Sequence, residues 1–270
     1  MKIDLIVKDR PSLNSPVIVC GLPGSAFVGK FAVDHLISEL SAKILAEIYS
    51  DCFPPQVTIK EDGTATLIKN ELFYCKSNRN NGGKDKRAGG RDLILYTGDA
   101  QPSTPESEYL LSEKIIDYLV KEHCAKELVT LGAFVTGSPT KAPKVYAAVT
   151  DVRLTPKLID SGCRMMSEGA ITGMNGLLLG MARLKGLTGF TLLGETSGYS
   201  FEARAPEEVL NSFSKIFGIS VDFSKLEQKA SEAQEVVQAI ERARAQQQAG
   251  ALMTPSQQKE EERRKTGYIS

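Results

Sequence analysis

The sequence predicts an α/β fold, with a mainly parallel sheet flanked by helices and a helical C-terminal extension. Three observations support this. Short apolar runs alternate along the chain with longer amphipathic stretches. Dense glycine stretches at 21–24 and 169–180 adjoin such runs. From residue 223 the apolar residues follow a heptad spacing. Alternating strands and helices favour parallel pairing with right-handed crossovers.

The N-terminal part of the chain is expected to supply both core and peripheral strands. We expect strands at 3–7, 17–21 and 43–49 and a helix at 25–40. Three further runs, at 56–60, 65–68 and 72–75, are closely spaced and predict a meander beside the main sheet. Residues 76–91 are basic, rich in glycine and without large apolar side chains, which is typical of a solvated loop. A phosphate-contacting loop is the alternative.

The next part repeats the alternation. Buried-type strands are expected at 92–97, 127–131, 145–149 and 190–193. Helices are expected at 106–122, 155–160, 177–184 and 206–217. The loop with three close glycines before 177 is expected to feed its helix. Pro156 suits a first helical position and Gly218 a C-terminal cap.

The C-terminal part changes character, so we divide the chain into an α/β core domain (1–222), an amphipathic helix (223–248) and a flexible tail (249–270). The helix carries a short heptad seam, formed by Leu226, Ala230, Ala233, Val237 and Ile240. Such a seam either docks on its own domain or pairs with a second subunit, and we favour oligomer contacts.

Charge and cysteine usage narrow the classes of partner and location. Lys plus Arg and Asp plus Glu each number 33, so the net charge is zero, which argues against nucleic acid as the main partner. No apolar run approaches the roughly 20 residues of a membrane span, and the N-terminus lacks the order of a signal peptide. Five scattered cysteines suit a reducing cytoplasm, where we expect the protein. With only two histidines, we expect no metal site and no cofactor.

The stretch Gly24–Lys30 matches the spacing of a phosphate-binding P-loop, G-x-x-x-x-G-K. A P-loop also needs a Ser or Thr hydroxyl after the Lys, and here Phe31 follows. The spacing of Phe27 and Val28 places them in a helix core. We therefore interpret the motif as a tight strand-to-helix junction, although an anion site at this helix start stays open.

Acid–base chemistry has four candidate carboxylates near predicted strand ends: Asp99, Asp151, Glu168 and Glu195. Two of them converging with Asn175 would form a hydrolase-like pocket. No Ser-His-Asp or Cys-His set can be assembled, because both histidines lie in predicted helices. We expect His35 to be packed in the core and His123 to close a helix. No motif in the sequence demands catalysis.

Several stretches together resemble the PAC2 (proteasome assembly chaperone) family. They are 21–30, Phe53-Pro54-Pro55, 92–95 with Gly98, Gln101-Pro102, Leu131-Gly132, 144–151, 171–180 and 192–196. They occur in family order over residues 15–225, and the helical extension is most similar to archaeal homologues. The resemblance marks these residues as family-motif positions: Gly21, Pro23, Gly24, Gly29, Lys30, Gly173, Asn175, Gly176 and Glu195.

The resemblance implies an architecture related to nucleoside phosphorylases and peptidyl hydrolases but a non-enzymatic chaperone. It implies homo-oligomers that bind α-subunits of the core proteasome, and a paralogous chaperone could join them. Some members dock through a C-terminal hydrophobic–Tyr–any tripeptide. Here the end is Tyr268-Ile269-Ser270, with the Tyr one position early. The alternative is a phosphorylase- or hydrolase-like enzyme that uses Gly24–Lys30 for an anion and Glu195 as acid or base.

Overall fold

The computed structural model describes residues 2–77, 91–199 and 202–223. The strands are β1 (Ile3–Val7), β2 (Val17–Cys20), β3 (Lys43–Ser50), β4 (Val57–Ile59), β5 (Ala65–Leu67), β6 (Asn70–Cys75), β7 (Leu93–Gly98), β8 (Glu127–Val135), β9 (Val145–Val149), β10 (Arg164–Met165) and β11 (Thr188–Thr196). The helices are α1 (Val28–Glu39), α2 (Pro105–His123), α3 (Thr155–Asp160), α4 (Gly173–Leu184) and α5 (Arg204–Phe217). Short 3₁₀ turns, Ser25–Phe27 and Val152–Leu154, precede α1 and α3.

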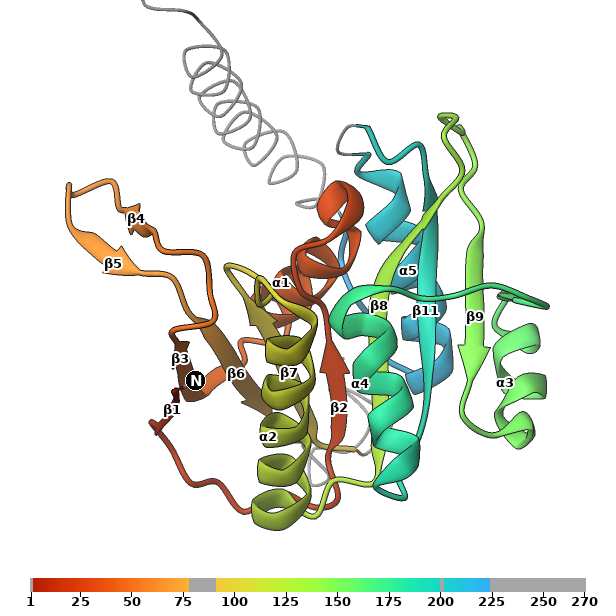
Figure 1. Ribbon diagram of the computed structural model, residues 1–270. Helices are drawn as coiled ribbons and strands as arrows, with labels where there is room; N and C mark the ends of the chain where they lie inside the picture. Colours follow the sequence, from red (N-terminus) through yellow and green to blue (C-terminus); the bar gives the residue numbers. More distant parts are fainter. Residues whose placement is uncertain (1, 78–90, 200–201, 224–270) are drawn as a thin grey trace, which may run out of the picture. The chain divides into compact units, whose positions relative to one another are not determined.

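The predicted α/β fold is confirmed (Figure 1). In the described part of the chain, the main sheet has nine strands in the order β1-β3-β6-β7-β2-β8-β11-β9-β10. Its centre, β7-β2-β8-β11, is parallel, while β1, β3 and β6 extend it antiparallel on one side and β9 does so on the other. Within the described residues, β4 and β5 form a separate two-stranded sheet. The expected meander is therefore wrong for β6, which pairs inside the main sheet because alternate residues along it are buried.

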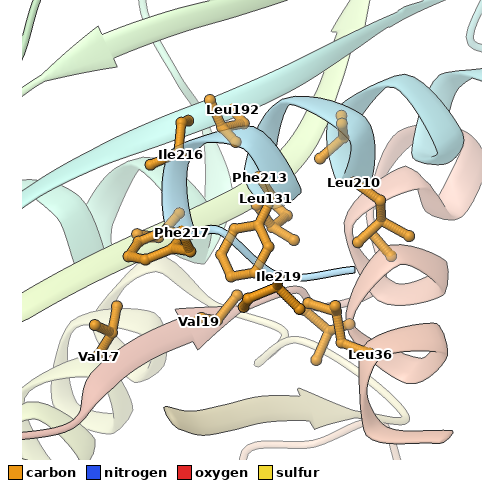
Figure 2. Packing of buried hydrophobic residues seen from close by; sticks show 14 of the residues in the cluster. Val17, Val19, Leu36, Leu131, Leu192, Leu210, Phe213, Ile216, Phe217 and Ile219 are labelled. Carbon is orange, nitrogen blue, oxygen red and sulfur yellow. The ribbon is translucent and has the colours of Figure 1, made fainter. Parts of the chain in front are cut away.

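Helices cover both faces of the sheet. Helices α1 and α5 lie on one face, and α2 and α4 lie side by side on the other (Figure 1). The hydrophobic core has two parts: the first lies between the sheet and helices α1 and α5, and the second between the sheet and helices α2 and α4. Strand β2 contributes to both, because Val17 and Val19 are in the first core and Ile18 and Cys20 are in the second, so both faces must be covered. In the first core, Phe213 and Phe217 of α5 pack over the central strands (Figure 2).

Two helix starts differ from expectation. Ala26 and Phe27 have left-handed φ angles of 48° and 54°, so α1 begins at Val28 rather than at residue 25. Val28 is buried as expected, but Phe27 is only half-buried, so its assignment to the helix core is wrong. Helix α4 begins at Gly173 rather than at residue 177, which places the later glycines of that stretch inside the helix.

Other helices follow their local signals. The Thr104 side chain accepts a hydrogen bond from the Ser107 N–H and caps α2, which ends at His123 as expected. Within the described ranges, no helix is both long and apolar enough to cross a membrane. Residues 1, 78–90, 200–201 and 224–270 lie outside the described part of the chain. The expectations for most of the 76–91 loop, the heptad seam and the tail therefore stay predictions.

Candidate functional site

A cavity of about 370 Å³ lies at the carboxyl ends of β2, β8 and β11. Open α/β sheets commonly place ligand sites at this position. We call this cavity the glycine cleft, since both glycine motifs form its walls; its lining includes Gly24, Ser25, Gln101, Phe134, Gly173 and Asn175.

Two glycines of the first motif allow close packing beneath the cleft. A Cβ on Gly21 would lie 2.1 Å from the carbonyl oxygen of Gly29. A Cβ on Gly29 would lie 2.0 Å from the carbonyl oxygen of Leu131 in β8. Both separations are far below van der Waals contact, so only glycine lets α1 start this close to the sheet. The motif thus has a packing role that requires no phosphate.

The second motif is tied to the first by one side chain that the sequence did not single out. The Gln101 side-chain oxygen accepts a hydrogen bond from the Met174 N–H at 2.8 Å. Its side-chain nitrogen donates to the carbonyl oxygen of Pro23. The only sequence signal for Gln101 was its place after a buried strand, within a family stretch. Nearby, Asn175 donates from Nδ2 to the carbonyl oxygen of Leu131 at 3.0 Å.

Lys30 does not serve the cleft. Its ammonium pairs with Asp34 at 3.0 Å, and the other Asp34 oxygen accepts from the Thr97 hydroxyl at 2.7 Å. Lys30 is not among the residues that line the cavity. The lysine of the P-loop-like spacing is therefore paired with Asp34 within α1, and Asp34 in turn joins α1 to the end of β7.

The carboxylates near strand ends do not converge. Glu195 accepts a hydrogen bond from the Lys144 N–H at 3.0 Å, and Asp99 accepts one from the Lys69 N–H at 3.0 Å. Neither lines the glycine cleft. Glu168 lines a different hollow beside α4.

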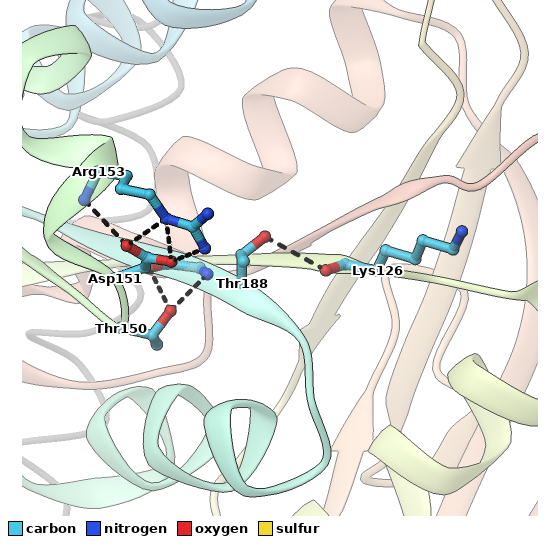
Figure 3. Close-up of polar contacts among 6 residues, drawn as sticks. Lys126, Thr150, Asp151, Arg153 and Thr188 are labelled. Atoms are coloured by element: carbon cyan, nitrogen blue, oxygen red, sulfur yellow. Dashed lines mark hydrogen bonds and ion pairs between the residues drawn. The ribbon is translucent and has the colours of Figure 1, made fainter.

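Asp151 follows β9, which runs antiparallel to β11. It therefore lies beside the start of β11, at the end of the strands that is opposite to the glycine cleft. Its carboxylate is bound by the N–H and guanidinium of Arg153, which holds the pKa of Asp151 at about 2 (Figure 3). The adjacent Thr150 hydroxyl contacts both backbone groups of Gly189 near the start of β11. None of the four carboxylates lines the glycine cleft with Asn175, so the hydrolase-like pocket considered from the sequence is not formed among the described residues.

The polar groups of the cleft are amides, hydroxyls and backbone groups. Among the described residues that line it, none carries a side chain that titrates in the physiological range. These residues can hydrogen-bond a small group but supply no general acid or base. His35 is in the core as expected, and its Nε2 lies 2.8 Å from the carbonyl oxygen of Asp222. Cys20 of β2 is packed in the core between the sheet and helices α2 and α4, and this burial raises the pKa of its thiol.

Known proteins resemble this chain over most of its length. The PAC2 family model matches residues 18–241. An uncharacterised protein of Methanocaldococcus jannaschii, MJ1210, is 31% identical over 237 residues, which cover 87% of each chain. The structure of Pyrococcus furiosus PbaB, described as an archaeal proteasome activator, is 35% identical with a TM-score of 0.76 and covers 88% of this chain and 98% of its own.

A second Pyrococcus furiosus structure shares the fold. PbaA, described as an archaeal homologue of a proteasome-assembly chaperone, is 24% identical with a TM-score of 0.71, and the match covers 90% of this chain and 100% of that one. The family match includes both walls of the glycine cleft and, apart from Val17 at the start of β2, the strands of the parallel centre of the sheet. This chain belongs to the PAC2 family.

Proposed function

We propose that this protein is a non-enzymatic chaperone or adaptor of the proteasome, which forms homo-oligomers and binds α-subunits of the core particle in the cytoplasm. The likeness to PbaB carries the proposal, because sequence and fold agree over nearly the whole of that chain. None of the five cysteines, which all lie in the described part of the chain, is joined in a disulfide, and this suits a reducing compartment.

The glycine cleft supports a role without catalysis. Its first motif packs a helix against β8, and the lysine of that motif is paired with Asp34. The described lining offers no proton donor or acceptor that titrates near neutral pH. These features favour a rigid binding scaffold over a phosphorylase- or hydrolase-like enzyme.

We propose two further contacts on segments outside the described residues. Tyr268, Ile269 and Ser270 contribute to α-subunit binding, and the heptad seam from Leu226 to Ile240 contributes to self-association. A paralogous chaperone is a further partner in this proposal.

Native mass spectrometry of the full chain with purified core α-subunits tests the proposal. We expect a complex that weakens when residues 246–270 are deleted or when Tyr268→Ala is introduced. Tyr199→Ala is the matched control, because Tyr199 is an exposed tyrosine on the core domain. Absence of any complex with the full chain overturns the proposal. A complex unchanged by both tail variants overturns only the role of the tail.

A further inference from the structure

An exposed apolar surface covers α4 and the start of α2. Leu184, Tyr109 and Leu110 are 87%, 59% and 49% exposed, respectively. A hollow of about 460 Å³ between the two helices is lined by Tyr109 and Leu184, together with Leu177 and Met181 of α4. A second hollow, of about 380 Å³, borders the other side of α4. We call this surface, with its two hollows, the α4 face.

The ridge between the hollows is kept low by glycines. Gly176 and Gly180 line both hollows. The chain's own packing requires Gly176, because a Cβ there would lie 1.9 Å from the carbonyl oxygen of Ile171. Gly180 is different, since a Cβ there would meet nothing within 4 Å and its φ is not positive.

A glycine inside a helix costs about 1 kcal/mol relative to alanine. Nothing in the described structure explains that cost at Gly180. Because glycine has no Cβ, an exposed glycine in a helix allows the backbone of another segment to approach closely. Gly180 therefore leaves room for another backbone to lie against the α4 face.

Two charges on this surface favour one kind of occupant. Glu108, in the first turn of α2, is half-buried in the hollow beside α4, and burial raises the pKa of its carboxyl. Arg183, in the last turn of α4, is exposed and lines the second hollow with Glu168. In the described part of the chain neither the carboxylate of Glu108 nor the guanidinium of Arg183 has a hydrogen bond or ion pair, although the charge of Arg183 helps to lower the pKa of Asp151.

The arrangement of these charges is self-complementary. Helices α2 and α4 precede parallel strands β8 and β11 and lie side by side, so they run in the same direction (Figure 1). Glu108 is thus in the first turn of α2, and Arg183 is in the last turn of α4, on the same surface. A two-fold axis would set Glu108 of each copy opposite Arg183 of the other, twice over.

We propose that the α4 face is an isologous interface between two copies of this chain. The two α4 helices cross at Gly180, Leu184 enters the hollow between α2 and α4 of the other copy, and Glu108 pairs with Arg183 across the axis. The inference rests on the self-association in the proposed function and names its surface.

Sedimentation velocity and native mass spectrometry of the full chain test the apolar part. Leu184→Glu is expected to raise the dissociation constant of self-association at least tenfold. Val152→Glu is the matched control, because Val152 is 79% exposed and lies outside the α4 face. An oligomer that withstands Leu184→Glu as well as it withstands Val152→Glu overturns this interface but leaves the proposed function standing.

A charge exchange tests the two-fold geometry. Glu108→Arg and Arg183→Glu should each weaken self-association, because like charges then face each other in each homo-oligomer. Mixing the two variants should restore it, because both facing pairs are then of opposite sign. Failure of the mixture to recover overturns the isologous pairing. Loss of α-subunit binding with intact self-association in Leu184→Glu would assign the surface to a client and also overturn it.

A monomeric full chain would overturn this inference together with the self-association in the proposed function. The binding of α-subunits is measured separately, so that part is judged on its own result.

Discussion

The side-chain oxygen of Gln101 accepts a hydrogen bond from the backbone N–H of Met174 at 2.8 Å. This contact caps α4, where the N-cap residue Thr172 makes no side-chain hydrogen bond to the helix. The same amide donates to the carbonyl oxygen of Pro23. One side chain after β7 thus joins the two glycine motifs that form the cleft.

Replacing Gln101 should loosen both walls of the cleft. Gln101→Leu removes both hydrogen bonds and leaves the Met174 N–H without its partner. We expect a loss of about 1–3 kcal/mol in the free energy of unfolding, measured by urea denaturation. Gln56→Leu, at an exposed glutamine beside β4, is the control and should change stability by less than about 0.5 kcal/mol. Equal effects of the two variants would show that the two hydrogen bonds of Gln101 contribute nothing to the free energy of unfolding.

The two ends of the first motif should differ in their tolerance of a methyl group. Gly29→Ala places a Cβ against the Leu131 carbonyl oxygen, and overpacking of this kind costs about 1–3 kcal/mol. Gly24→Ala should change stability by less than about 0.5 kcal/mol, because its nearest neighbour would lie at 3.8 Å and its φ of −162° is extended. Thermal and urea unfolding measure both. A Gly29→Ala protein as stable as the parent would contradict the packing role.

The ion pairs of Glu47 should make stability depend on acid pH. Glu47 lies 2.5 Å from Lys69 and 2.7 Å from Lys8. The hydrogen bond with Lys69, and then that with Lys8, hold the pKa of Glu47 below its ordinary value of 4.5. A carboxyl with a lowered folded-state pKa stabilises the fold above its unfolded-state pKa, and this contribution is lost as pH falls through the folded-state value.

Glu47→Gln should therefore cost about 1 kcal/mol at pH 7 and progressively less below about pH 5. Urea denaturation of the parent and variant across this range measures the difference. Glu61→Gln, at an exposed residue without an ion pair in the described structure, is the control and should show a small, constant difference. A gap between parent and Glu47→Gln that stays constant with pH would refute the assignment.

His35 should hold the segment that follows α5. Its Nε2 donates to the Asp222 carbonyl oxygen, and its ring stacks on Phe223 with centroids 6.2 Å apart. His35→Leu should speed amide hydrogen exchange across residues 219–223 at least tenfold. His123→Leu, which replaces the other buried histidine, should leave that segment unchanged. Unaltered exchange in His35→Leu would show that other contacts hold the segment.

The sequence by itself determined the fold class and most elements, because their signals are local. Strand β2 is a continuous apolar run, and such runs are typical of strands buried on both faces. Helix α2 has its cap residue Thr104 and its Pro105 at the first position, next to each other in the chain. The ordered family stretches likewise identified the family from residues alone.

Tertiary structure decided the parts that depend on residues far apart in the chain. One such part is the order and direction of the strands: β6 pairs with β3 and β7, and β9 runs antiparallel to β11. As a result, carboxylates that a strand-end rule would group lie apart. The glycines at the start of α4 suggest a loop in the sequence, but they lie in the helix. Gly176 is needed there because it packs closely against Ile171. The bridge from Gln101 to Pro23 and Met174 forms only after the strands assemble. Local patterns record which residues become buried, whereas close backbone approach and strand order arise from long-range packing.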